Sequence, residues 1–72
     1  MYKLSYEEFR ADMYKREQKR YAESLVQSTF EHWSEEACKF NADCHIEMMM
    51  RINDDEEMRK MYRQYLNNIR NV

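Results

Sequence analysis

The chain has 72 residues, 36% of them charged, and its net charge is −2 at pH 7. This length allows one domain at most, and its hydrophobic core must be thin because short chains bury a smaller share of their surface. No apolar run approaches the roughly 20 residues of a membrane span, and the N-terminus lacks the basic-then-apolar layout of a signal peptide, so we expect a cytoplasmic protein with no membrane contact.

The composition favours helices throughout. Glycine and proline are absent, so the usual residues for sharp turns and breaks are missing. Residues that form helices well, such as Leu, Met, Glu, Lys, Arg and Gln, are abundant. We predict an all-α fold, a compact bundle of three or four helices in one domain spanning residues 1–72.

The first helix has a clear predicted start. Ser5 and Glu8 form an S-x-x-E capping box, in which each side chain can bond the other residue's backbone amide. Leu4 and Phe9 occupy the staple positions that flank this cap. The spacing predicts a helix that begins at Tyr6.

Apolar residues then recur at helical spacing in two groups separated by a basic segment. One helix from about residue 6 to 33 is the preferred interpretation, and a kink near residues 15–19 is the alternative. The first group is Tyr6, Phe9 and Met13, and the second is Tyr21, Ala22, Leu25, Val26, Thr29, Phe30 and Trp33. Between them, four cations share a stripe that we expect to lie off the apolar face: Lys15, Arg16, Lys19 and Arg20.

The middle of the chain leaves alternatives open. Ser34, followed by two glutamates, can cap a new helix, and continuation through Ser34 is equally plausible. Asn41 suits the left-handed end of a helix, and Asp43 suits the start of the next. We therefore expect a bend at residues 40–43.

The last helix has two candidate caps, Asn53 paired with Glu56 and Asp54 paired with Glu57. Four consecutive acids at residues 54–57 suit a first turn, where the helix dipole favours negative charge. A regular apolar stripe follows: Met58, Met61, Tyr62, Tyr65, Leu66, Ile69 and Val72.

The cysteines and histidines do not predict a metal site. No C-x2-C pair is present, and Cys38 and His45 would stand about 10 Å apart along a helix. A disulfide between Cys38 and Cys44 needs Cα atoms within about 7 Å, whereas a helix separates them by about 9 Å. We expect no metal, no cofactor and no disulfide, and both cysteines buried or half-buried as small apolar residues.

Catalysis is not expected either. Cys44 and His45 are adjacent, so on a helix they point to different sides, and no oxyanion hole is recognisable. The paired acids lie at predicted helix starts, where capping explains them. We therefore predict that the protein is not an enzyme.

Several features favour partner binding. The chain has six tyrosines, one tryptophan and three consecutive methionines at residues 48–50. These exceed the needs of so small a core, and such residues are enriched at interfaces. We predict a small module that binds a larger protein and modulates or inhibits it, of the kind that phages and mobile elements encode. The candidate partner-binding residues are Lys15, Arg16, Lys19, Arg20, Trp33, Met48, Tyr62 and Tyr65.

Two alternatives remain. The charge is uneven, at +2 over residues 1–22, −8 over 23–57 and +4 over 58–72. The basic stripe at residues 15–20 could therefore serve a nucleic-acid-associated regulator. The thin core could instead be completed by self-assembly, with a homodimer closing over the C-terminal stripe and the face around Leu25, Val26, Phe30 and Trp33.

Overall fold

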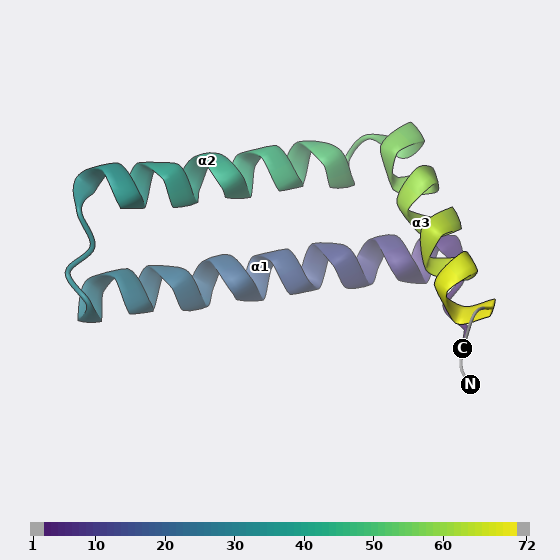
Figure 1. The fold of residues 1–72 in the computed structure, drawn as a ribbon, viewed down its shortest axis with the longest axis horizontal. Helices are drawn as coiled ribbons and strands as arrows, with labels where there is room; N and C mark the ends of the chain where they lie inside the picture. Colours follow the sequence, from purple (N-terminus) through teal and green to yellow (C-terminus); the bar gives the residue numbers. More distant parts are fainter. Residues whose placement is uncertain (1–2, 71–72) are drawn as a thin grey trace.

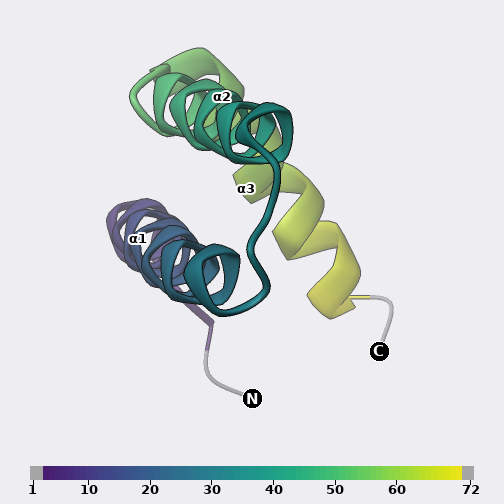
Figure 2. The same cartoon turned by 90° about the vertical axis from the view of Figure 1, so that its left-hand side faces the viewer.

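A computed structural model describes residues 3–70, which form a small all-α bundle of three helices with no strand among them. The helices are α1 (Tyr6–Phe30), α2 (Glu35–Ile52) and α3 (Asp55–Arg70). α1 and α2 run antiparallel as a long hairpin, and α3 crosses its open end beside the start of α1 (Figure 1). Seen along the hairpin, α3 lies to one side of the α1–α2 pair (Figure 2). The predicted fold class is confirmed.

The predicted start of α1 is confirmed in detail. The Glu8 amide donates to Ser5 Oγ at 3.2 Å, and the Ser5 amide donates to Glu8 Oε1 at 3.0 Å. Both bonds satisfy amides that have no partner within the helix. α1 then continues without a break through residues 15–19, so the preferred single helix is correct and the kink is not seen.

α1 ends three residues earlier than predicted. The Trp33 amide donates to the Ser28 carbonyl at 3.0 Å, and His32 adopts a positive φ of 53°. This pattern is the Schellman motif, whose left-handed position is usually glycine. Because the chain has no glycine, histidine occupies that position. Ser34 then caps α2 by accepting from the Ala37 amide at 3.1 Å, which confirms the capping alternative.

The predicted bend at residues 40–43 is wrong, because α2 is continuous there. Asn41 is buried, and its Nδ2 donates to Ser24 Oγ on α1 at 2.8 Å. The side chain that was expected to end a helix is therefore engaged in a tertiary hydrogen bond. That bond removes the local competition by which asparagine interrupts helices.

α3 begins with the second of the two predicted caps. Asp54 Oδ1 accepts from the amides of Glu56 at 3.1 Å and Glu57 at 3.3 Å. The turn before it is short, since Asn53 still bonds the Met49 carbonyl at 3.1 Å. This short turn holds α3 at the open end of the hairpin.

The apolar core lies where the three helices meet. Phe9, Ile52 and Met58 are its buried apolar residues in the described part of the chain, and Met58 is fully buried. The rings of Tyr62 and Tyr65 lie 5.5 and 5.1 Å from that of Phe9, between centroids. Such aromatic contacts add about 0.5–1.5 kcal/mol each beyond their buried area.

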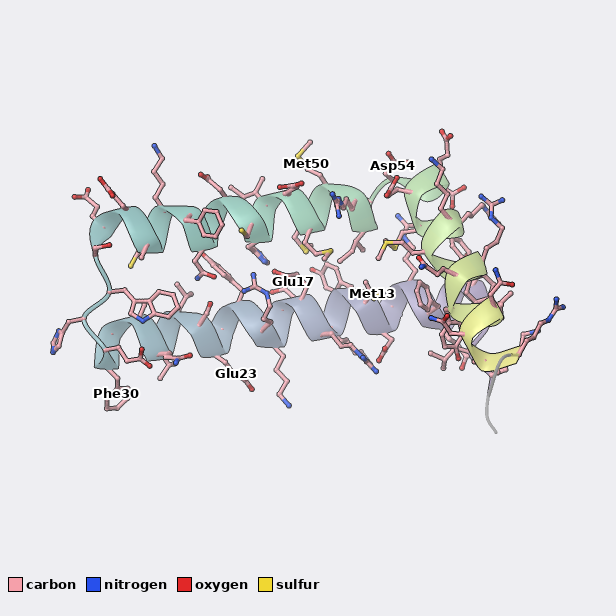
Figure 3. All side chains as sticks on the ribbon, in the orientation of Figure 1. Met13, Glu17, Glu23, Phe30, Met50 and Asp54 are labelled. Atoms are coloured by element: carbon pink, nitrogen blue, oxygen red, sulfur yellow. The ribbon has the colours of Figure 1, made fainter. Side chains whose placement is uncertain are left out.

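α3 packs on the start of α1 and leaves the face around Leu25, Val26 and Phe30 uncovered. Tyr62 Oη donates to the Leu4 carbonyl at 2.9 Å, and the Leu4 amide donates to Tyr65 Oη at 3.0 Å, so α3 covers the start of α1. Val72, the last residue of the predicted stripe, lies outside the described residues. Leu25, Val26 and Phe30 are exposed, and Phe30 points away from α2 (Figure 3).

Removal of the first cap tests this helix start. Ser5→Ala should destabilise the protein by about 1 kcal/mol in chemical denaturation, because the Glu8 amide loses its side-chain acceptor, whereas the bond from the Ser5 amide to Glu8 remains possible. Ser28→Ala is the matched control, since Ser28 Oγ donates to the Leu25 carbonyl inside the helix at 2.8 Å. Equal stability of Ser5→Ala and wild type would show that the cap contributes nothing.

Candidate partner-binding groove

A buried carboxylate lies at the centre of the α1–α2 interface. Glu17 on α1 is only 6% exposed, and its Oε2 lies 2.6 Å from His45 Nδ1 on α2. Arg20 Nε and Nη2 donate to the two carboxylate oxygens of Glu17 at 2.9 and 2.8 Å. This forked pairing is the strongest form of ion pair that side chains make.

The polar contacts extend along the interface from this carboxylate. Arg20 Nη1 donates to Asn41 Oδ1 at 3.2 Å, and Asn41 in turn donates to the buried hydroxyl of Ser24. The rings of Tyr21 and His45 stack 4.0 Å apart with their planes 5° from parallel. We call Glu17, Arg20, Ser24, Asn41 and His45 the interhelical polar cluster. No buried polar side-chain atom in the described part of the chain lacks a hydrogen-bond partner.

The cluster holds Glu17 in its ionised form. The Arg20 hydrogen bonds lower the pKa of the Glu17 carboxyl, and the His45 contact lowers it further, while burial acts in the opposite direction. The net direction is downward, so the carboxylate stays charged below the pH at which an ordinary glutamate takes up a proton.

A groove opens beside the cluster. It is lined by residues of α2, by the loop that joins α1 and α2, and by Arg20 of α1. Its volume is about 510 Å³, and Phe40 at its edge is 71% exposed. Arg20 also borders a smaller adjoining hollow of about 270 Å³, which Met13, Arg16 and Met48 help to line. We call the larger space the hairpin groove. Its lining residues are Arg20, Trp33, Ser34, Ala37, Phe40, Asn41 and Cys44.

The predicted partner-binding residues divide into four pairs. Arg20 and Trp33 line the hairpin groove, and Arg16 and Met48 line the adjoining hollow. Lys15 and Lys19 are exposed outside both spaces. Tyr62 and Tyr65 contact Phe9 and Leu4, so they serve the packing of α3 on α1.

The predicted basic stripe of the first helix is not a uniform cationic surface. Arg16 pairs with Asp12 at 2.8 Å, and Lys19 lies 4.0 Å from Glu23. Arg20 was expected off the packed face but instead reaches into the α1–α2 interface. Three of the four cations therefore have a carboxylate neighbour on the same helix, which reduces their attraction for an outside anion.

Several site residues were missed from the sequence. Phe40 was overlooked because a bend was expected there, and a continuous α2 places it on the groove edge instead. Glu17 and His45 gave no usable signal, because they are 28 positions apart and each is ordinary on a helix surface. Only the antiparallel packing of α1 and α2 brings them together.

The prediction for the two cysteines is half right. Cys44 is half-buried, as predicted, but Cys38 is exposed. Asn41 and His45 of α2 make polar contacts with α1, and Cys38 is not covered in this way. Both thiols are unpaired. Within residues 3–70, no group of three or more His, Cys, Asp or Glu side chains is placed to hold a metal ion.

Comparison with protein-family models, with curated proteins and with solved structures finds no match to this chain. None of the described helices combines the length and apolar character needed to cross a membrane. The hairpin groove and the surfaces around it are the features of the described residues that point to a function.

The lowered pKa of Glu17 predicts a specific loss of stability in acid. Its ionisation stabilises the fold above the carboxyl pKa of the unfolded chain, and this contribution disappears as the pH falls through the lower pKa of the folded state. Glu17→Gln should lower the free energy of unfolding by about 1–3 kcal/mol at neutral pH. When the pH is then lowered, this variant should lose less additional stability than the wild type does. Denaturation at a series of pH values measures both effects.

Glu23→Gln is the matched control for this change, since Glu23 is an exposed glutamate on the same helix whose pairing with Lys19 is long. Its stability should stay within about 0.5 kcal/mol of wild type at each pH. Identical pH profiles for Glu17→Gln and wild type would contradict the role assigned to the buried carboxylate.

Proposed function

We propose that the protein is a non-enzymatic binding module that attaches to a larger protein and modulates or inhibits it. The observation that carries the proposal is the hairpin groove, an open space of about 510 Å³ edged by a largely exposed phenylalanine. Exposed apolar surface of this kind, rimmed by polar groups, is typical of protein-binding sites.

The partner is proposed to present an amphipathic helix. α3 already packs against the open end of the same hairpin, so α1 and α2 can accept a helix across them (Figure 2). The groove lies at the other end, where α3 does not reach. A partner helix could place an apolar side chain between Trp33 and Phe40, which is the helix-in-groove mode of recognition.

The chemistry beside the groove supports binding rather than catalysis. A general base works best when its pKa is near the working pH, whereas the pKa of Glu17 is lowered by Arg20. Arg20 is itself held by Glu17 and Asn41, so both charges are already paired. These groups can orient a polar atom of a partner at the groove, and they supply no poised acid or nucleophile.

The proposed setting is the cytoplasm, where two unpaired cysteines are ordinary. A role as an accessory or inhibitory factor of a phage or mobile element is the more specific form of the proposal. The small size and the mixed polar and apolar surface fit a protein whose activity lies in occupying another protein.

Two phenylalanines provide a matched test of the groove. Phe40 lines it and is 71% exposed, whereas Phe30 is 81% exposed and lies outside it. In a tagged pull-down read by native mass spectrometry, wild type and Phe30→Asp should retain the same protein partner, and Phe40→Asp should lose it. Circular dichroism checks that both variants remain helical. Retention by Phe40→Asp, or equal loss by both variants, would contradict the assignment.

Self-association is a second proposal with its own observation. Leu25, Val26 and Phe30 are exposed on one side of α1 and are covered by neither α2 nor α3. A two-fold pairing of α1 with its copy would bury this face. Sedimentation at micromolar concentration should show a dimer that Val26→Glu converts to monomer, while Ile46→Glu on α2 leaves it intact. A monomeric wild-type protein would exclude this dimer.

A further inference from the structure

The exposed face of α3 carries a concentration of positive charge. No carboxylate occurs from Met58 to Arg70, and this segment contains four cations. Helical spacing places them opposite the fully buried Met58, with amide side chains between them. The residues of this face are Arg59, Lys60, Arg63, Gln64, Asn67 and Arg70, and all of them are exposed.

The position of α3 leaves this face open. The other side of the helix packs on α1 through Tyr62 and Tyr65, and α3 crosses the end of the hairpin rather than lying within it (Figure 1). Arg59 is already engaged, since its Nε donates to Asp55 at 2.9 Å and its guanidinium lies 4.4 Å from the centre of the Tyr6 ring. Lys60, Arg63 and Arg70 extend beyond these contacts.

We propose that this face of α3 binds double-stranded DNA in the major groove. An α-helix fits the major groove of B-DNA, whereas the deep, narrow major groove of RNA excludes side chains. Lys60, Arg63 and Arg70 would contact phosphates, which provide most of the binding energy. Gln64 and Asn67 lie between these cations, and amide side chains are the groups that pair with adenine edges. An acidic protein partner would be bound by the cations alone. The amide side chains among the cations therefore favour DNA over an acidic protein.

The same arrangement limits the strength and the direction of binding. The acids at residues 54–57 occupy the start of α3, so repulsion keeps that end away from phosphates. The contact therefore uses the segment from Lys60 onward. With three cations on phosphates, affinity should fall roughly 40-fold between about 50 and 200 mM salt. This site is independent of the hairpin groove and goes beyond the proposed protein binding.

The test compares two double charge reversals in the full chain. Lys60→Glu with Arg63→Glu alters the proposed face, and Lys15→Glu with Lys19→Glu makes the same charge change on the exposed side of α1. Fluorescence anisotropy with a short labelled DNA duplex should show salt-dependent binding by wild type. The α3 variant should bind at least tenfold more weakly, and the α1 variant within about threefold of wild type, since about two phosphate contacts are lost only in the first.

Several results would overturn the proposal. Absence of duplex binding by wild type would do so, as would equal losses in the two variants, because net charge alone would then explain the effect. Tighter binding to single strands or to duplex RNA would reject the major-groove geometry. Binding of polyglutamate without binding of DNA would assign the face to an acidic protein. Lys60→Ala with Arg63→Ala repeats the test should the charge reversal unfold the chain.

The amides give an independent readout of base contact. Gln64→Ala with Asn67→Ala should leave the salt dependence of duplex binding unchanged, because the phosphate contacts remain. The same variant should reduce the difference in affinity between adenine-rich and guanine-rich duplexes. An unchanged difference would show that α3 contacts phosphates alone, and would overturn the major-groove assignment.

Discussion

The α1–α2 hairpin depends on a single buried carboxylate. Burial of an isolated charge is strongly unfavourable, so Glu17 is stable inside the interface only while Arg20 and His45 contact it. A shift of α2 by one turn along α1 would remove His45 from Glu17 and Asn41 from Ser24. The polar cluster therefore fixes the register of the two helices more strictly than apolar contacts, which tolerate sliding.

The hairpin groove adjoins this polar cluster. Ala37 and Cys44 on α2 are small, so they leave space beside Arg20 and Asn41 where larger side chains would fill a core. Phe40 lies at the edge of this space with most of its ring exposed. Arg20 and Asn41 thus belong both to the stabilising cluster and to the lining of the candidate binding surface.

The aromatic residues are divided unevenly along the molecule. Tyr62 and Tyr65 on α3 pack against Phe9, and Tyr6 packs against Tyr62, so aromatic contacts join α3 to the start of α1 at the open end of the hairpin. At the loop end, Phe30 and Phe40 are exposed. The groove and the cationic face of α3 lie toward opposite ends of the hairpin, so occupation of one leaves the other accessible (Figure 1).

The sequence by itself determined the features that depend on residues close together along the chain. The cap at Ser5, the start of α3 at Asp54 and the apolar stripe that packs through Met58 depend on contacts within one turn or one helix, so spacing revealed them. Tertiary structure alone decided the continuity of α2 through Asn41 and the pairing of Glu17 with His45. Those outcomes depend on partners 17 and 28 positions away. A hydrogen bond supplied from that distance outweighed the local tendency of asparagine to end a helix.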